Sequence, residues 1–352
     1  MIILAIETSC DETSVAVVED GQHVHSLVVN SQIDIHKAYG GVVPEIAARS
    51  HIEVMLPVID QALDEAAKKW SDIDAIAVTQ GPGLLGSLLI GVLTARTLAW
   101  AKGIPLYPVH HILGHIYANW ITSGPAYKTP YPVKQPEFPM LALIVSGGHT
   151  QLMYGESHKN WKVIGRTTDD AVGEAFDKVA KVLGLPYPGG PSIAQAAKNG
   201  DSQKYRLPTP QVKDMYGYSF SGLKTALLRS VQKECGKDHQ FPSFELAALL
   251  SEQQKADFAA SFQAKAVEYL VSKTKLASEN LSPKSVIIGG GVAASLPLRT
   301  AISKAIPIHV EYAPQILCTD NAAMIGARAY YQSQTENPVD PRHLETKPSW
   351  PL

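Results

Sequence analysis

The sequence predicts an α/β fold in which one architectural unit occurs twice. Two apolar hairpins support this, at Ile2–Val18 and Met140–Tyr154, and in each of them apolar runs flank a short polar turn. An apolar strand followed by a glycine-rich loop and the start of a helix also occurs twice, at Asp74–Gly86 and Lys284–Ser295. The same order in both halves favours an internal duplication. Coincidence is the alternative, because such elements are common in α/β proteins.

Length and composition fit a soluble globular chain with a sizeable core. The chain has 352 residues, 31 Lys and Arg against 33 Asp and Glu, a formal net charge of −2 and 45% apolar residues. These values exclude a disordered chain, a collagen-like repeat and a highly basic nucleic-acid coat. The N-terminal apolar run breaks at Glu7, and no apolar stretch of about 18 residues occurs elsewhere. We therefore expect a cytoplasmic protein that does not associate with membranes.

Cysteine usage agrees with a reducing compartment. Cys10, Cys235 and Cys318 are odd in number, lie far apart and have no C-x-x-C spacing. Neither a disulfide framework nor a cysteine zinc site is expected.

The spacing of the repeated elements locates an insertion. Ile6 and Ile144 hold equivalent positions 138 residues apart, whereas Val78 and Ile287 are 209 residues apart. The second half therefore carries about 71 extra residues, which we place near residues 165–235. We expect two lobes, the first formed by residues 1–110 and 320–352 and the second by residues 111–319.

Four further segments have a simple structural interpretation. Pro44–Lys69 and Ser251–Leu276 carry apolar residues at helical spacing and are interpreted as packing helices. Thr122–Pro139 holds five prolines and is expected to be an irregular loop, and the Pro-rich tail after Gln334 is expected to wrap the surface.

The glycine-rich segments favour a phosphate-binding function over a dinucleotide fold. Gly81–Gly86 matches G-x-G-x-x-G, but no acidic residue lies in residues 97–112 to bind a ribose, and the P-loop pattern is absent. In a duplicated fold, the two hairpin tips can instead face each other across a central cleft and clamp a phosphate. The loop Gly289–Gly291 would then flank a nucleoside.

A metal site is a second prediction. His111 and His115 are four residues apart in HHILGHIYAN and share one face if the segment is helical. Asp320, in CTDNAAMIGARA, joins them if the C-terminal helix folds back against the first half. Two histidines and one carboxylate suit one divalent ion, Fe(II) or alternatively Zn(II). The structural alternatives are capping or core histidines and an Asp320 that serves as an N-cap.

Charge supports a nucleic-acid partner only locally. Residues 161–240 contain twelve Lys and Arg and eight Asp and Glu, so this segment carries +4 and the remainder −6. A basic insert on an acidic body can meet an RNA backbone, and a solvated face is the alternative.

Seven blocks of sequence together resemble one known family. They occur in order from residue 3 to about residue 327: ETSCDETSVA, HHILGH, IVSGGHTQL, DDAVGEAFDKVAKVLGLPYPGGP, SFSGLKTA, GGGVAAS and CTDNAAMIG. This combination resembles the universal tRNA N6-adenosine threonylcarbamoyltransferase family, formerly called O-sialoglycoprotein endopeptidase. The resemblance implies an actin-like, sugar-kinase/Hsp70-type ATPase fold with duplicated RNase H-like lobes. It also implies transfer of a threonylcarbamoyl group from threonylcarbamoyl-AMP to N6 of adenosine 37 in tRNAs that read codons beginning with A, with release of AMP.

The resemblance also implies roles for individual residues. It assigns the metal, usually iron, to His111, His115 and Asp320. It also implies that seven further matched residues line the substrate site: Ile144, Val145, Ser146, Gly147, Gly148, Asp177 and Gly190. Family members commonly read GGVSAN where this chain reads GGVAAS, so Ser295 replaces an asparagine that contacts the nucleotide. Serine keeps a hydroxyl but lacks the paired donor and acceptor of the amide.

The chemistry that the resemblance implies needs positioning more than covalent catalysis. The donor is an activated mixed anhydride and the adenine amine is a poor nucleophile. Asp11, with Glu12 second, is the candidate to orient or deprotonate that amine, and an Asx-turn is the structural alternative for Asp11. An ATP-dependent phosphotransferase of the same fold, a metallopeptidase and a non-catalytic scaffold are the competing functions. HExxH is absent and HHILGH is retained.

Partners follow from the same resemblance. Besides tRNA, the family implies a non-catalytic paralogue that pairs with the N-terminal lobe and a small P-loop ATPase. The compact form and the YPGG block are similar to bacterial members.

Overall fold

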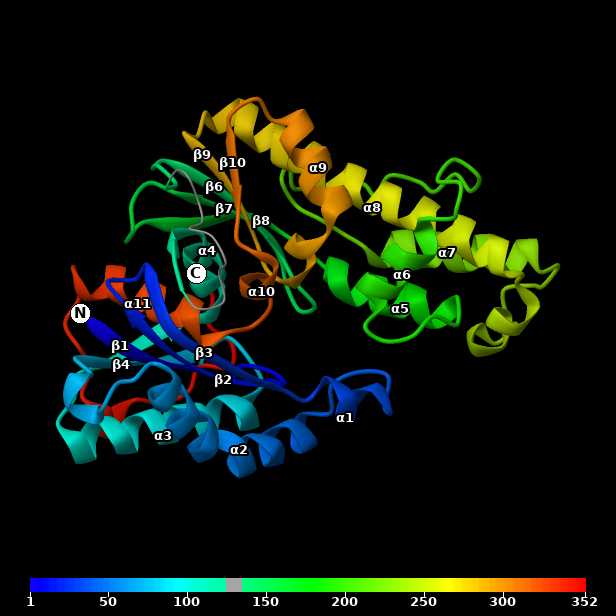
Figure 1. The fold of residues 1–352 in the computed structure, drawn as a ribbon. Coiled ribbons are helices and arrows are strands. Elements are labelled where there is room, and N and C mark those ends of the chain that lie inside the picture. Colours follow the sequence, from blue (N-terminus) through cyan, green and yellow to red (C-terminus); the bar gives the residue numbers. More distant parts are fainter. Residues whose placement is uncertain (125–134) are drawn as a thin grey trace. The chain divides into compact units, whose positions relative to one another are not determined.

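The computed structural model describes residues 1–124 and 135–352 and contains two five-stranded sheets with helices packed on them (Figure 1). The predicted irregular loop Thr122–Pro139 lies in part on residues 125–134, outside the described residues. The chain divides into two compact units. Unit 1 comprises residues 1–138, 155–161 and 311–352, and unit 2 comprises residues 139–154 and 162–310.

The sheet of unit 1 forms because alternating and continuous apolar runs at the N-terminus pair with one another. β1 pairs antiparallel with β2 and parallel with β4, so the predicted hairpin forms the middle of the sheet. The strand order is β3-β2-β1-β4-β5. The bounds are β1 Ile2–Glu7, β2 Glu12–Glu19, β3 His23–Ser31, β4 Ala75–Gly81 and β5 Leu106–His110.

The second sheet repeats this order with later strands. It reads β8-β7-β6-β9-β10, and β6 pairs parallel with β9 as β1 pairs with β4. The predicted duplication is therefore confirmed at the level of sheet topology. The predicted cleft concerns the placement of the two units and stays a prediction. The bounds are β6 Met140–Val145, β7 Thr150–Gly155, β8 Trp161–Arg166, β9 Ser285–Gly289 and β10 His309–Tyr312.

Helices cover both faces of the first sheet. Figure 1 shows α2 and α3 side by side on one face and α11 on the other, and α4 packs against α11. The helices are α1 Ile33–Lys37, α2 Pro44–Glu65, α3 Leu85–Lys102, α4 His111–Tyr117, α10 Gln315–Cys318 and α11 Ala322–Ser333. Short 3-10 helices are η1 Trp70–Asp72, η2 Ala118–Trp120 and η5 Pro341–His343.

Unit 2 carries more helix between its third strand and the strand that follows. Three α-helices and a 3-10 helix come between β8 and the long helix α8. They are α5 Val172–Val182, α6 Gly189–Ala197, α7 Ser221–Glu234 and η3 Ser243–Leu249, followed by α8 Glu252–Leu281, η4 Gly291–Ala294 and α9 Leu296–Ala305. Helices α5 to α7 all lie inside the range 165–235 where the extra residues were placed.

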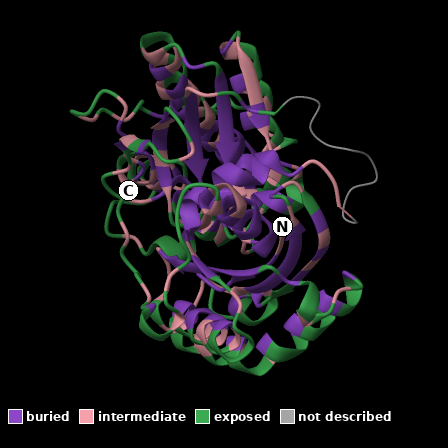
Figure 2. Ribbon diagram, turned by 90° about the vertical axis from the view of Figure 1, so that its left-hand side faces the viewer, coloured by how far each residue is buried: buried purple, intermediate pink, exposed green. Residues whose placement is uncertain are grey.

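The two long helices agree with their predicted ranges to within a few residues. The hydroxyl of Ser251 accepts from the Gln254 N–H and the Gln254 side chain accepts from the Ser251 N–H, and this capping box starts α8. In α2 the residues at helical spacing, among them Met55 and Ile59, are buried against the sheet. The packing interpretation holds for both helices. Figure 2 shows most of the strand residues as buried and the outer helix faces as largely exposed.

The compact units differ from the predicted lobes in three stretches, residues 111–138, 155–161 and 311–319, which all belong to unit 1. Unit 1 includes α4, whereas the predicted boundary after residue 110 separates α4 from β5. The reason is packing, because α4 contacts β5, β4 and α11, all of unit 1. The predicted lobe boundaries remain a proposal. In the described residues, no helix combines the length and apolar character that a membrane span requires.

Candidate metal centre and active site

His111 and His115 open the short helix α4 directly after β5. Their spacing of four residues places both imidazoles on one face, with ring centroids 4.7 Å apart. His111 is 5% exposed and His115 is 1% exposed. A buried pair of neighbouring imidazoles is a metal-ligand arrangement when a third donor is present.

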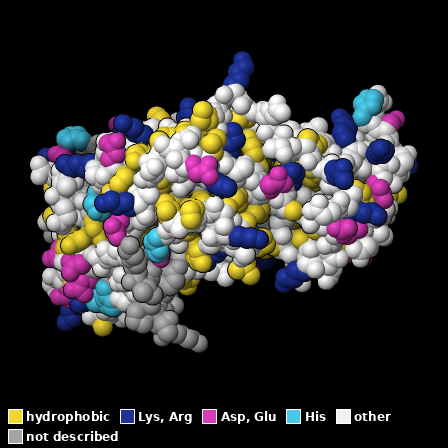
Figure 3. Space-filling view, turned by 90° about the horizontal axis from the view of Figure 1, so that it is seen from above, with side chains coloured by type: hydrophobic (Ala, Val, Ile, Leu, Met, Phe, Trp, Pro, Cys, Tyr) yellow, Lys and Arg dark blue, Asp and Glu magenta, His cyan; other side chains and the backbone are white. Residues whose placement is uncertain are grey.

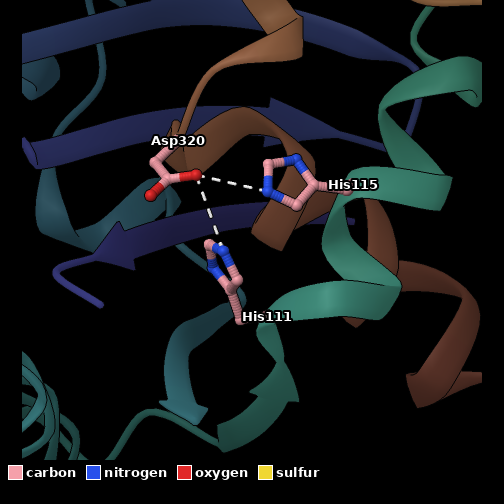
Figure 4. A group of neighbouring side chains, drawn as sticks. All are labelled: His111, His115 and Asp320. Atoms are coloured by element: carbon pink, nitrogen blue, oxygen red, sulfur yellow. Dashed lines mark ion pairs between the residues drawn. The ribbon is translucent and has the colours of Figure 1, made fainter. Parts of the chain in front are cut away.

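Asp320 supplies that third donor. Its Oδ1 lies 3.2 Å from Nε2 of His115 and 3.5 Å from Nε2 of His111 (Figure 4). The three candidate ligand atoms lie within 4.8 Å of one another. Asp320 does not serve as the N-cap of α11, because the Asn321 side chain accepts from the Met324 N–H instead. The structure thus brings the three predicted residues together in unit 1.

A glycine allows the two helices to approach. A Cβ at Gly114 would lie 2.9 Å from Cδ1 of Ile325 and 3.2 Å from Cγ of Met324, both in α11. A larger side chain at this position would require Ile325 and Met324 to shift. This contact places the carboxylate that precedes α11 beside the imidazoles of α4.

Glu7 orients His111 from the opposite side. Its carboxylate is fully buried at the end of β1 and lies 3.1 Å from Nδ1 of His111. It also accepts from the Thr79 hydroxyl and the Ser9 N–H, each at 2.5 Å. A carboxylate that holds Nδ1–H directs the lone pair of Nε2 toward a metal, as in many zinc and iron proteins.

The donor set fits a divalent cation. Both ring nitrogens of His115 are buried and make no hydrogen bond to any described residue, although Nε2 is within ion-pair distance of Asp320. A buried imidazole without a hydrogen bond is costly unless another ligand satisfies it. Two imidazoles and one carboxylate are ligands that both Fe(II) and Zn(II) accept. The protein therefore contains a group of residues that can hold a metal ion.

The acidic groups dominate the electrostatics of this centre. Burial lowers the pKa of His111, but the charges of Glu7 and Asp320 outweigh burial and raise it to about 9. Burial raises the pKa of Glu7, and the facing His111 reverses this and lowers it.

The hairpin tip between β1 and β2 holds Asp11 and Glu12. Burial and the charges of Asp320 and Asp11 raise the pKa of Glu12 to about 9, so Glu12 keeps its proton at neutral pH. His51 of α2 anchors the tip, because its Nε2 donates to the Cys10 carbonyl at 2.9 Å and its Nδ1 accepts from Thr13 at 2.7 Å. Burial lowers the pKa of His51, which agrees with a neutral ring that accepts at one nitrogen.

The segment Ile144–Gly148 ends β6 in unit 2. Ile144 and Val145 are buried strand residues, and Gly147 and Gly148 are exposed in the loop. The Ser146 N–H donates to the His149 carbonyl, and the Ser146 carbonyl accepts from the Gly173 N–H at the start of α5. A Cβ at Gly147 or Gly148 would meet no atom of the described part of the chain within 4 Å, which leaves both backbones open to a ligand.

The other predicted substrate residues also lie in unit 2. Asp177 of α5 accepts from the Gly189 N–H at 2.7 Å, and burial raises its pKa. The neighbouring Gly190 has open space where a side chain would be. Ser295 precedes α9 and its hydroxyl does not cap that helix. Gly290, with φ of +91°, packs on the Val145 carbonyl, so the two glycine loops lie together at the ends of β6 and β9.

Sequence reasoning did not single out the residues around the imidazoles. Glu7 and Ser9 were read only as part of a polar turn, and Thr79 as part of a strand. An acid directly after the apolar run IILAI is the signal that could have identified Glu7, because a buried acid needs partners. No sequence signal pairs Thr79 with it.

Comparison with known proteins identifies the family. The family model for tRNA N6-adenosine threonylcarbamoyltransferase matches residues 23–327. A protein of that name from Thermomicrobium roseum is 49% identical over 95% of this chain and 92% of its own length. One from Halalkalibacterium halodurans is 50% identical over 93% of this chain and 90% of its own length. One from Bacillus subtilis is 46% identical over 93% and 89%.

A solved structure supports the fold independently. Full-length HypF in its phosphate- and nucleotide-bound form is 12% identical to this chain and superposes with a TM-score of 0.57. The match covers 95% of this chain and 46% of the HypF chain. At this identity the likeness shows the fold alone. This likeness and the repeated sheet order agree with the predicted actin-like, sugar-kinase/Hsp70-type fold. With a family model over most of its length and relatives near half identity, the chain belongs to the tRNA N6-adenosine threonylcarbamoyltransferase family of tRNA-modifying enzymes.

Proposed function

We propose that the protein transfers the threonylcarbamoyl group of threonylcarbamoyl-AMP to N6 of adenosine 37 in tRNAs that read codons beginning with A. The amine attacks the carbamoyl carbon, the bond from that carbon to the phosphate oxygen breaks, AMP leaves and the amine gives up a proton. The observation that carries the proposal is the convergence of His111, His115 and Asp320 in a member of this family.

His111, His115 and Asp320 would hold one divalent cation, Fe(II) or alternatively Zn(II). When bound, this ion supplies Lewis-acid polarisation and orientation of the threonylcarbamoyl group. Glu7 would keep His111 in the tautomer that presents Nε2. The burial of both imidazoles supports a site from which competing water is largely excluded.

Asp11 would orient the attacking amine or accept its proton. Glu12 retains a proton at neutral pH, which makes it a poor base and leaves Asp11 as the candidate. The His51 anchor supports this role, because it binds the Cys10 carbonyl on one side of Asp11 and the Thr13 hydroxyl on the other. An exocyclic adenine amine is weakly basic, so accurate placement accounts for most of the required rate gain.

Ile144–Gly148, Asp177, Gly190 and Ser295 would bind the adenylate. The open backbone of Gly147 and Gly148 supports phosphate binding by N–H groups, and the space beside Gly190 supports close approach of the nucleoside. Ser295 would offer one hydroxyl where relatives commonly offer an amide.

The proposed macromolecular partners are tRNA, a non-catalytic paralogue and a small P-loop ATPase. We define the α2–α3 apolar face by its exposed side chains: Ile52, Leu56, Leu85, Leu89 and Leu93. It lies on two adjacent helices and supports docking of the paralogue on unit 1. Residues 161–240 carry +4, and Figure 3 shows Lys and Arg side chains with acids among them where α7 lies in Figure 1. That segment is the proposed contact for tRNA, and the cytoplasm is the proposed location.

The test is mass spectrometry of tRNA nucleosides after incubation of the protein with threonylcarbamoyl-AMP, tRNA and the two helper proteins. The proposal expects threonylcarbamoyladenosine with the intact chain and none with His111→Ala or Asp320→Ala. Equal product from a metal-stripped His111→Ala chain would remove the metal from the reaction.

Family membership does not favour the alternatives, a phosphotransferase and a metallopeptidase. Incubation with ATP and sugars, and separately with peptides, provides their tests. A phosphorylated sugar or a cleaved peptide, without modified tRNA, would contradict the proposal.

A further inference from the structure

We propose that the C-terminal segment Glu345–Trp350, here named the C-terminal strap, positions the metal-binding helix α4 through His110. The inference rests on the proposed metal centre but concerns residues that no part of the proposed reaction uses. The strap also lies outside residues 23–327, the range that the family model matches.

The strap is attached to the loop that follows β4. The Gln80 side chain donates to the Glu345 carbonyl at 2.7 Å, and the Lys347 N–H donates to the Gln80 carbonyl at 2.8 Å. The Gly83 N–H then donates to the Pro348 carbonyl at 3.1 Å. Three hydrogen bonds, one from the Gln80 side chain and two between backbone groups, hold the strap along residues 80–83.

Gly81 shows how close this contact is. A Cβ at Gly81, which has φ of +156°, would lie 1.8 Å from the Lys347 carbonyl oxygen. Any side chain there would displace the strap. The loop after β4 is therefore shaped to accept the strap backbone.

The C-terminal end of the strap contacts His110, the residue that precedes the proposed metal ligand His111. Nε2 of His110 lies 2.9 Å from the Trp350 carbonyl, and the two rings are 4.8 Å apart. Nδ1 of His110 accepts from the Ile112 N–H at 3.2 Å and caps α4. Since Nδ1 accepts, Nε2 carries the hydrogen and donates to Trp350, so one ring links the strap to the start of α4.

The same loop reaches the imidazole of His111 by a second route. The Leu84 N–H donates to the Ser9 carbonyl at 2.8 Å, and the Ser9 hydroxyl lies 3.2 Å from Nδ1 of His111. A Cβ at Gly83 would lie 2.5 Å from the Ser9 carbonyl oxygen, so this contact is also tight.

Because α4 is short, its position depends on contacts with other parts of the chain. The helix has only seven residues and carries both imidazoles in its first five positions. A helix this short does not hold its geometry by its own hydrogen bonds. Its N-cap and its packing on α11 set the direction of the imidazoles, and the strap fixes the capping ring.

The experiment measures binding of Co(II), a spectroscopic probe for the site, by competition with a chelator and by its visible absorption. Four forms of the chain are compared: full length, without residues 345–352, without residues 349–352, and without residues 351–352, which are exposed. We expect the first two truncations to lower Co(II) affinity about 10- to 100-fold and to change the absorption spectrum. The last truncation is the control and retains full affinity.

A double-mutant cycle tests the route through His110. His110→Ala alone is expected to lower affinity like the truncation, and the two changes together are expected to cost no more than either. His110→Asn, which keeps a capping oxygen, is expected to recover part of the loss. Arg96→Ala serves as a stability control, because it removes bonds to the Pro341 and Arg342 carbonyls and leaves the strap residues intact.

Full Co(II) affinity in the chain without residues 345–352 would overturn the inference, as would additive losses in the cycle. An equal loss of affinity in Arg96→Ala would also overturn it, because general destabilisation would then explain the effect. Strap-dependent Co(II) binding in a chain that forms no modified adenosine would refute the proposed function and leave this inference standing.

Discussion

Asn321 caps α11 and thereby leaves the carboxylate of its neighbour Asp320 to face the two histidines of α4. Asn321 Oδ1 accepts from the Met324 N–H at 3.0 Å, while Oδ1 of Asp320 lies 3.2 Å from Nε2 of His115. Adjacent residues thus perform two separate tasks, one as the cap of α11 and the other as the candidate ligand. The Asn321 cap stabilises the first turn of α11, and the position of α11 in turn determines where the Asp320 carboxylate lies.

This division predicts opposite effects of two neighbouring substitutions. Asp320→Asn keeps the size of the side chain but removes the charge, so bound metal and transfer activity are expected to be lost with little change in melting temperature. Asn321→Ala is expected to lower the free energy of unfolding by about 1 kcal/mol and to retain metal at saturating concentration. Metal analysis of purified protein and thermal unfolding distinguish the two. Stoichiometric metal in Asp320→Asn would show that the carboxylate is not a ligand.

Glu7→Gln is predicted to weaken metal binding without exposing any surface. The amide has the shape of the carboxylate but lacks the charge that holds Nδ1–H of His111. We expect metal affinity to fall about 10- to 100-fold in a chelator competition. Glu19→Gln is the matched control, because Glu19 pairs with His25 on the same hairpin, away from the imidazoles. Equal affinities for the two variants would argue against an orienting role for Glu7.

Metal binding is predicted to release protons at neutral pH. The pKa of His111 is about 9 without metal, because Glu7 and Asp320 outweigh burial, and a ligand imidazole must be neutral. Apparent affinity should therefore rise about tenfold per pH unit up to about pH 9 and level off above it. Calorimetry in buffers of different ionisation enthalpy counts the protons. Glu7→Gln should reduce proton release from His111, since Glu7 is a cause of the raised pKa, and pH-independent affinity would contradict the account.

The stability of unit 1 is predicted to fall in mild acid through His158. This residue stacks on Tyr331 and lies 2.6 Å from the Tyr117 hydroxyl, and burial and Arg328 lower its pKa to about 4. An unfolded histidine has a pKa of about 6.5, so between these values the unfolded chain binds more protons. The contribution of neutral His158 to the free energy of unfolding is complete above pH 6.5 and is lost as the pH falls toward 4.

Melting temperatures near pH 7.5 and pH 5 measure this loss. The drop between them is expected to shrink in His158→Phe and to persist in His239→Phe, which changes an exposed histidine. An identical drop in all three proteins would assign the acid sensitivity to other groups.

The α2–α3 apolar face is predicted to carry the contact with the paralogue. Ile52 is 62% exposed, so Ile52→Asp should change the free energy of unfolding by less than about 0.5 kcal/mol. It should weaken binding of the paralogue by at least about tenfold in titration or co-elution. Phe244→Asp, at a residue on η3 that is 73% exposed, is the control. Binding that survives Ile52→Asp and fails in Phe244→Asp would move the interface to unit 2.

Local sequence patterns sufficed for the repeated architecture. The middle three strands of each sheet follow from local patterns in the sequence. These patterns are the apolar runs around Ile6 and Ile144 and the strand–glycine-loop segments that contain Val78 and Ile287. The order and the apolar periodicity of these segments are enough to predict which strands pair. The triad was predictable in part: the spacing of His111 and His115 is local, whereas Asp320 required the fold to be duplicated.

Long-range tertiary contacts account for what the sequence did not reveal. Thr79 and Glu7 are in contact although they are 72 residues apart in the sequence, and the strap contacts His110 from 240 residues away. No periodicity in the sequence predicts either contact. The structural alternative for Asp320, the N-cap of α11, is not observed. The adjacent Asn321 accepts from the Met324 N–H instead, and both residue types are good caps, so the sequence alone does not distinguish them.

Anomalous X-ray diffraction from crystals grown with Fe(II) or Zn(II) tests the central claim most directly. The account predicts one metal peak within about 2.0–2.2 Å of Nε2 of His111, Nε2 of His115 and a carboxylate oxygen of Asp320. The peak should vanish in Asp320→Asn. A metal held by other side chains, or no peak in a protein that still modifies tRNA, would contradict it.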